Sequence, residues 1–201
     1  MVAVQELAPD QAEALAAGLP HGMLAPRDDY DGGGIALARP GQVERISMAH
    51  RDGFRVTLRP DAWPELTAPL EILGVHILAP HADLGRGLAR RPRQLRDLLG
   101  HLETPASGGR VVVGDFNATP VWPVYRRMAR RMSDAAVDLA RREGRRPRRT
   151  WGPRPGGGAL LRIDHGFVEG VTAERFRVVS VEGSDHRAVV LDVAAGERPA
   201  P

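Results

Sequence analysis

Four short segments of the chain end an apolar run with polar side chains that could do chemistry. Residues 111–120, VVVGDFNATP, run three valines into Gly114, an acid, an aromatic and an amide. The other segments are VAVQEL, GVHILAP and the pair RIDH and GSDH. Polar groups at strand ends point into the crevice above a sheet, where sites are usually built. The candidate site residues are Glu6, His76, Asp115, Asn117, Asp164, His165, Ser184, Asp185 and His186.

Several carboxylates at one crevice would repel one another unless a cation lay between them. The chain has no cysteine, which excludes disulfides and thiolate metal sites. Oxygen ligands suit a hard ion, so the pattern indicates Mg²⁺ or Mn²⁺. Within the GDFN segment, Gly114 would allow a close backbone approach.

Each segment taken singly also has a plain structural explanation. Gln5 and Glu6 could decorate the surface, and His76 could be a satisfied core histidine. Asp115 and Asn117 could form an Asx turn that ends a strand, while Asp164 or His165 could cap a turn. The order and spacing of all four segments together favour a site.

The elements that must position these residues alternate along the chain. Apolar stretches predict buried strands at 70–80 and 111–117, and alternating patterns predict antiparallel edge strands at 42–50 and 53–60. Helical spacing predicts helices at 9–19, 89–102, 121–131 and 133–143. Residues 21–34 are expected to be a glycine-broken loop. Further strands are expected at 2–7, 34–38, 161–170, 175–183 and 185–195. Strands outnumber helices, which predicts an α/β fold of sheets packed face to face with helices outside.

Length and composition describe one globular domain. The chain has 201 residues, of which 42% are hydrophobic and 26% charged, enough to bury a core. No apolar run approaches the length of a membrane span, and no export signal begins the chain. We expect a domain over residues 1–195 and a disordered tail at 196–201. The expected location is the cytoplasm, or a membrane or the exterior if an N-terminal segment precedes this sequence.

Positive charge is concentrated in one segment. All 28 basic residues are arginine, and residues 126–149 hold ten of them against three acids, a net charge of +7. The remainder of the chain carries a net charge of −4. Such a segment could hold a phosphate backbone. On the sequence alone, we favour a solvated helix face followed by a flexible loop.

Taken together, the motifs resemble those of the endonuclease/exonuclease/phosphatase superfamily. The resemblance runs from Val2 to about Val193 and rests on QE, H-x-x-x-P, GDFN, the aspartate of RIDH, and SDH in that order. It implies a four-layer α/β sandwich of two packed mixed β-sheets flanked by helices. It also implies divalent-metal-dependent hydrolysis of a phosphoester.

The resemblance assigns a role to each matching residue. Glu6 and Asp185 match positions at the metal, while His186 matches a histidine that contacts the scissile phosphate and is oriented by Asp164. Asp115 would activate the attacking water, and Asn117 would donate to a phosphate oxygen. His76 matches a second phosphate-contacting histidine.

The resemblance also implies that a first strand bearing an asparagine, and the helix after it, are missing before Met1. We therefore expect reduced stability and impaired activity for this chain. Two functions remain open. One is a metal-dependent phosphodiesterase or nuclease acting on nucleic acid, a lipid head group or another phosphoester. The other is an inactive family member that binds polyanions through its arginines. We expect a monomer with no obligate protein partner.

Overall fold

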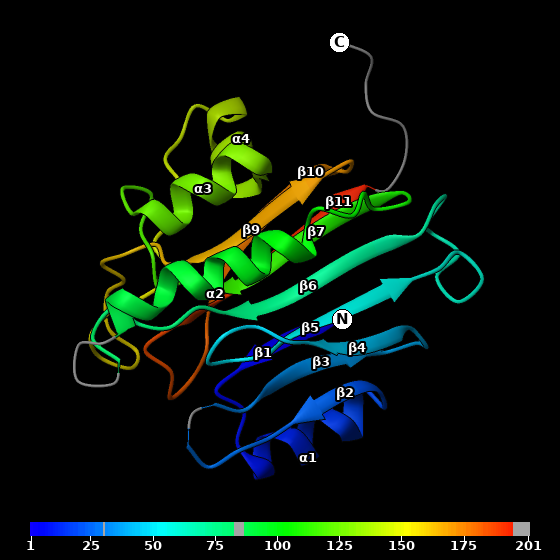
Figure 1. Cartoon of the computed structure of the whole chain (residues 1–201), viewed down its shortest axis with the longest axis horizontal. Coiled ribbons are helices and arrows are strands. Elements are labelled where there is room, and N and C mark those ends of the chain that lie inside the picture. Colours follow the sequence, from blue (N-terminus) through cyan, green and yellow to red (C-terminus); the bar gives the residue numbers. More distant parts are fainter. Residues whose placement is uncertain (30, 83–86, 195–201) are drawn as a thin grey trace.

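The computed structural model describes residues 1–29, 31–82 and 87–194 (Figure 1). The predicted tail at 196–201 lies outside the described residues. In chain order the elements are β1 (Val2–Gln5), α1 (Pro9–Gly18), β2 (His21–Ala25), β3 (Gly33–Leu37), β4 (Gln42–Ile46), β5 (Gly53–Leu58), β6 (Leu70–His76), α2 (Gly87–His101), β7 (Gly109–Asp115), α3 (Pro123–Arg131), β8 (Ser133–Asp134), α4 (Ala135–Arg142), β9 (Asp164–Glu169), β10 (Thr172–Ser180) and β11 (Arg187–Ala194).

The central layer is a six-stranded mixed sheet in the order β4-β5-β6-β7-β9-β8. Strands β6 and β7 are parallel and are joined through α2, whereas the other pairs are antiparallel. Alternate side chains of a strand point to opposite faces, so a strand covered on both faces is apolar throughout. This is why β6 and β7 read as continuous apolar runs in the sequence.

Each face of this sheet borders its own core. On one face, Leu73, Val75 and Val112 pack against α2 and α3, with Leu98 and Met128 fully buried. On the other face, the residues adjacent to these in the same strands, such as Ile72 and Val111, pack against β3, β10 and α4. The predicted α/β fold of packed sheets with helices outside is confirmed.

The second layer consists of two smaller sheets, β1-β3-β2 and β10-β11. Strand β1 contacts β6 and β7, while β10 and β11 contact β9. Figure 1 shows α1 outside the β1-β3-β2 sheet, at the opposite end of the molecule from α3 and α4. None of the helices in the described residues is long and apolar enough to cross a membrane.

Two local predictions were wrong. Residues 21–25 were expected in a loop but form β2, which pairs antiparallel with β3 from His21 to Ala25. Gly22 permits this pairing because its φ is +120° and a Cβ there would lie 2.1 Å from the carbonyl oxygen of Ile35. Strand β5 was expected at an edge but lies between β4 and β6. Both misses concern pairing with distant strands, which local polarity does not encode.

Candidate active site

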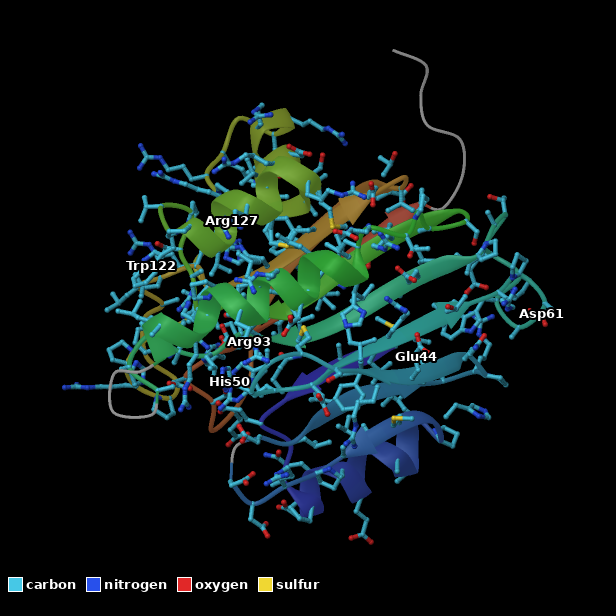
Figure 2. The ribbon with its side chains drawn as sticks, viewed as in Figure 1. Glu44, His50, Asp61, Arg93, Trp122 and Arg127 are labelled. Atoms are coloured by element: carbon cyan, nitrogen blue, oxygen red, sulfur yellow. The ribbon has the colours of Figure 1, made fainter. Side chains whose placement is uncertain are left out.

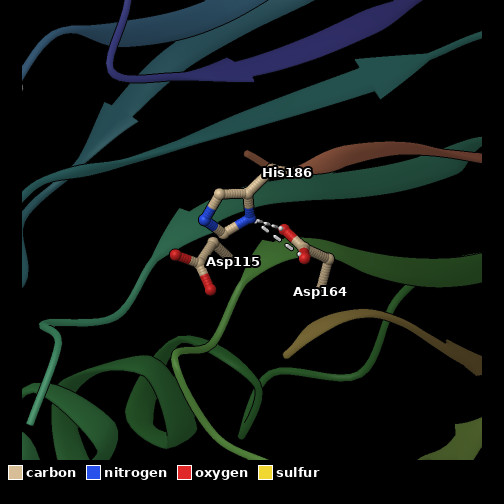
Figure 3. Close-up of side chains that lie close together, drawn as sticks. All are labelled: Asp115, Asp164 and His186. Carbon is tan, nitrogen blue, oxygen red and sulfur yellow. Dashed lines mark hydrogen bonds and ion pairs between the residues drawn. The ribbon is translucent and has the colours of Figure 1, made fainter. Parts of the chain in front are cut away.

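Strands β6 and β7 of the central sheet end with polar residues, side by side with the polar residue at which β9 begins. His76 is the register partner of Asp115 across the parallel pair β6–β7. Asp115 is in turn the partner of Asp164 across the antiparallel pair β7–β9. Figure 3 shows Asp115 and Asp164 converging with His186, which reaches them from the segment before β11. The pairing of strands distant in the sequence therefore builds this cluster.

The turn after β7 holds the Asp115 carboxylate on two sides. The backbone N–H of Asn117 donates to Oδ1 at 2.7 Å, and the side-chain Nδ2 of Asn117 donates to Oδ2 at 2.6 Å. Nδ2 also donates to the carbonyl of Ile77 at 3.0 Å. Asn117 has a φ of +46°, a left-handed conformation that asparagine tolerates better than most residues. Both hydrogens of the Asn117 side-chain amide are therefore donated to protein acceptors in this structure.

Gly114 brings β7 close to its neighbour. Its φ is +142°, and a Cβ at this position would lie 1.9 Å from the carbonyl oxygen of Val75. The close backbone approach predicted for Gly114 is confirmed, and the partner is β6. Substitution would push β6 and β7 apart at the point where His76 and Asp115 meet.

His186 and Asp164 form a hydrogen-bonded pair. Nδ1 of His186 lies 3.0 Å and 3.1 Å from the two carboxylate oxygens of Asp164. Burial would lower the pKa of His186, but the hydrogen bond to Asp164 and the charges of Asp164, Asp115 and Asp185 outweigh it and raise the pKa to about 9. The imidazolium is therefore the dominant form at neutral pH, with Nδ1–H directed to Asp164.

The pKa of the Asp115 carboxyl is also raised, which favours its neutral form. Burial, reinforced by the negative charge of Asp164, raises its pKa well above the usual range. The charge of His186 and the hydrogen bond from the backbone of Asn117 partly oppose this increase in the pKa. A buried acid with a raised pKa has the property required of a general base at neutral pH.

His76 lies on the other side of Asp115. Its Nε2 is 3.5 Å from Asp115 Oδ2 and 3.9 Å from Glu6 Oε1. Burial, the charge of Arg51 and the charge of His186 lower the pKa of His76 to about 3, so the ring is neutral. Glu6 is half-exposed at the end of β1 and adopts a φ of +56°.

Arg51 is a residue of this site that the sequence did not reveal. Its Nη1 lies 2.6 Å from Nε2 and 2.8 Å from Nδ1 of His76, and its Nε donates to Asp31 at 2.6 Å. Only 16% of its side chain is exposed. The segment SMAHRDG contains no motif that distinguishes Arg51 from the other arginines, so only its contacts identify it.

A second unforeseen arginine lies beneath the turn after β7. The buried Arg91 of α2 donates to the backbone carbonyls of Asn117 at 2.8 Å and Phe116 at 3.3 Å. Its guanidinium also lies 5.1 Å from the ring centroid of Trp122. Arg91 therefore satisfies the carbonyls that the turn leaves unpaired and places a positive charge near Asp115.

Thr150 connects the two turns that meet at the site. Its Oγ1 accepts from the backbone N–H groups of Ile163 and Asp164, both at 3.1 Å. Its carbonyl accepts from the backbone of Arg187 at 2.7 Å. The turn before His186 is also fixed by Ser184, whose Oγ accepts from the His186 backbone at 3.1 Å. Thr150 therefore sets the position of Asp164 relative to His186.

His165 contacts the turn after β7 from the protein interior. It is completely buried, and its Nε2 lies 2.7 Å from the carbonyl of Ala118, directly after Asn117. Arg162 lies 2.9 Å from Nδ1 of His165 and donates to Asp134 at 2.7 Å. His165 thus has a structural environment, unlike its neighbour Asp164.

The carboxylates at this site suit a divalent cation. Ligand atoms of Asp115, Asp164 and His186 all lie within 4.8 Å of one another. Two buried carboxylates this close repel each other, and a hard cation would relieve that repulsion. Glu6 lies at the margin of the cluster, beside His76. Asp185 is exposed and its Oδ2 accepts from the indole N–H of Trp151 at 2.9 Å.

Comparison with known proteins agrees with this fold and site. The model of the Endonuclease/Exonuclease/phosphatase family matches residues 1–186. The chain therefore belongs to this family, whose members hydrolyse phosphoester bonds. No curated protein matches the sequence.

Solved structures share the fold at low sequence identity. A Neisseria 3′ phosphatase, NExo, bound to a product DNA hairpin has a TM-score of 0.70 and 18% identity, covering 93% of this chain and 85% of that one. A humanized D. rerio TDP2 has a TM-score of 0.70 and 18% identity, with coverages of 96% and 84%. A mannosyl-6-phosphatase of Bacteroides thetaiotaomicron has a TM-score of 0.58 and 15% identity, with coverages of 95% and 84%.

Proposed function

We propose that this protein is a divalent-metal-dependent phosphodiesterase that acts on nucleic acid. The observation that carries the proposal is the register of β6, β7 and β9, which places His76, Asp115 and Asp164 side by side. The pair formed by Asp164 and His186 adds a positively charged imidazolium to the cluster, which would contact the phosphate.

In this proposal Asp115 takes a proton from the attacking water. Its raised pKa suits this role, and Asn117 holds the carboxylate in position through both oxygens. A new P–O bond then forms as the bond to the leaving oxygen breaks. Negative charge that develops on the phosphate is stabilised by the imidazolium of His186, which Asp164 orients through Nδ1.

Glu6 and Asp185 are the residues that would hold Mg²⁺ or Mn²⁺ in this proposal. The ion would neutralise charge on the phosphate oxygens. Arg51 and neutral His76 would contact the phosphate from the other side.

The balance of charge supports a diester over a monoester. Ligand atoms of the buried Asp115 and Asp164 lie within 4.8 Å of each other, and the charge of Arg51 is offset by its ion pair with Asp31. Such carboxylates repel a monoester with two negative charges more strongly than a diester with one. The DNA-bound structure of the Neisseria phosphatase supports a nucleic-acid substrate by analogy of fold.

Hydrolysis of bis-p-nitrophenyl phosphate, p-nitrophenyl phosphate and plasmid DNA tests the proposal. Each substrate is assayed with Mg²⁺, Mn²⁺ or EDTA, using the natural chain and the variants Asp115→Asn and Asp61→Asn. Asp61 is exposed, and Figure 2 places it far from Trp122 and His50. We expect metal-dependent cleavage of the diesters that Asp115→Asn lowers by about 10²–10⁴-fold and Asp61→Asn leaves intact. Equal activity in EDTA, or faster cleavage of the monoester, contradicts the proposal.

A further inference from the structure

We propose that the exposed arginines of α3, α4 and the following loop bind the phosphodiester backbone of a nucleic acid, at a surface separate from the catalytic residues. This arginine surface is defined by Arg126, Arg127, Arg130, Arg142, Arg146, Arg148 and Arg149, all of which are exposed. The inference goes beyond the proposed function, because binding here needs neither metal nor hydrolysis.

The first observation is that these arginines have no acidic partner. Within the described residues, none of the seven forms an ion pair. Their neighbours Arg131, Arg141 and Arg145 use the nearby acids Glu169, Asp138 and Glu143. Seven unpaired guanidinium groups within 24 residues repel one another, and a polyanion would remove that repulsion.

Several arginines elsewhere are paired with an acid: Arg27 with Asp29, Arg39 with Glu65, Arg45 with Asp52, and Arg175 with Asp192. Five other arginines of the described residues are also exposed without an ion pair, but they are spread over several elements: Arg59, Arg93, Arg96, Arg154 and Arg177. The chain outside residues 126–149 is net acidic, at −4. A polyanion would therefore be attracted more strongly to the arginine surface than to the rest of the molecule.

The arginine surface is attached to the active site at both of its ends. Helix α3 begins six residues after Asn117, and the loop that follows α4 ends at Thr150, which holds Asp164. Helix α2 lies against α3. A nine-residue helix such as α3 is about 13 Å long, roughly four phosphate spacings of one strand.

The surface lacks the apolar groups that a membrane-binding helix inserts. The large exposed hydrophobic side chains of the described residues are Met1, Val2, Leu88, Val121, Leu160, Leu161, Val179 and Val181. None of them lies between residues 122 and 149. Amphipathic membrane helices need an exposed apolar face as well as charge. Arginine forks, by contrast, match phosphate oxygens without help from apolar contacts.

Binding of a fluorescent 30-nucleotide DNA, single- or double-stranded, tests this inference. Fluorescence anisotropy is measured in EDTA at several NaCl concentrations, so that hydrolysis plays no part. Two triple variants are compared, Arg126→Gln/Arg127→Gln/Arg130→Gln and Arg146→Gln/Arg148→Gln/Arg149→Gln. The control, Arg59→Gln/Arg175→Gln/Arg177→Gln, removes the same charge from exposed sites elsewhere. Far-UV circular dichroism establishes that each variant is folded.

Each arginine that contacts a phosphate contributes about one unit to the slope of log Kd against log[NaCl]. We expect each surface variant to reduce the slope by about 2–3 units, and the control to change it by less than about one unit. The inference is overturned if the control weakens binding as much as the surface variants, or if both surface variants bind like the natural chain. It is also overturned if anionic phosphatidylserine vesicles bind more tightly than the DNA. Because no turnover is measured, a failure of catalysis leaves this result interpretable.

Discussion

The hydrogen bond between Asp164 and His186 determines the charge of the histidine as well as its orientation. Nδ1 lies 3.0 Å from Asp164 Oδ1, and the neighbouring carboxylates outweigh the effect of burial on the pKa. On the other side of Asp115, His76 is held neutral by burial and by Arg51. Two histidines of similar chemistry thus have different charges a few ångströms from the same carboxylate.

Asp164→Asn removes the negative charge beside His186 and keeps the shape of the side chain. We expect the pKa of His186 to fall from about 9 toward or below its ordinary value, because burial then acts with less opposition. An NMR pH titration of the imidazole Cε1–H measures it. Asp138→Asn, on the surface of α4, is the matched control. A His186 pKa that stays near 9 in Asp164→Asn contradicts the assignment.

Arg51→Gln tests the arginine that borders the site. Hydrogen bonds to charged groups contribute about 1.5–3 kcal/mol, so loss of the phosphate contact should lower kcat/KM by roughly 10–150-fold. The pKa of His76 should rise in the same variant, because the charge of Arg51 lowers this pKa in the natural chain. Arg45→Gln, in an exposed ion pair with Asp52, is the control. Unchanged kcat/KM in Arg51→Gln would remove Arg51 from the site.

Turns and loops, rather than the strands themselves, bring the last residues to the cluster. The segment 150–152 pairs with the residues on both sides of His186, through Thr150, Trp151 and Gly152. Arg91 of α2 stabilises the turn after β7 by donating a hydrogen bond to the backbone carbonyl of Asn117. The loop that follows α4 supplies, through Thr150, the contacts that hold Asp164.

Thr150→Val replaces the hydroxyl with a methyl group of similar size. It leaves the buried N–H groups of Ile163 and Asp164 without their acceptor, at a cost of about 1–3 kcal/mol each. We expect a loss of about 2–6 kcal/mol in the free energy of unfolding, measured by urea denaturation, together with a reduced kcat. Thr150→Ser keeps the hydroxyl and should restore most of both quantities. If Thr150→Val and Thr150→Ser behave alike, the hydroxyl has no such role.

Across the molecule as a whole, negative and positive side chains gather in two different regions. The cluster at the ends of β6, β7 and β9 collects carboxylates, while α3, α4 and their loop collect arginines. The carboxylate cluster makes the metal-free protein sensitive to pH.

The metal-free protein should lose stability between pH 6.5 and 9. His186 has a folded-state pKa of about 9 against an unfolded value near 6.5, so its contribution is present below pH 6.5 and is lost as the pH rises. Asp115, whose folded-state pKa is also raised, acts in the same direction. His76 and His165 have lowered pKa values, about 3 and about 4, so they contribute stability above pH 6.5 and do not offset the loss.

Urea unfolding in EDTA at pH 6.5 and 9 measures this change. His186→Gln should flatten the dependence, whereas His21→Gln, an exposed histidine of β2, should not. A metal that binds only the folded state at 100 times its Kd adds about 2.7 kcal/mol. We therefore expect Mg²⁺ or Mn²⁺ to raise the stability at pH 9. A stability that increases from pH 6.5 to 9 in EDTA contradicts the electrostatics of the site.

Most elements and the polar ends of the strands follow from local pattern. Apolar runs predicted β6 and β7, helical spacing predicted α1–α4, and the GDFN and SDH segments identified Asp115 and His186. These signals are local because burial and turn formation depend on residues close in the chain. Pairing is not local, so β2 was taken for a loop and β5 for an edge strand.

The convergence of the site depends on contacts between distant segments. His76, Asp115 and Asp164 are neighbours because β6, β7 and β9 pair in one register, and a shift of one residue would turn them to other faces. Arg51, Arg91 and Thr150 belong to the site through hydrogen bonds that span 13 to 26 residues of sequence. Arginine and threonine occur throughout the chain, so residue type could not single them out. The motifs therefore indicated the family by resemblance and supplied the candidate chemical groups, while folding selected which groups meet.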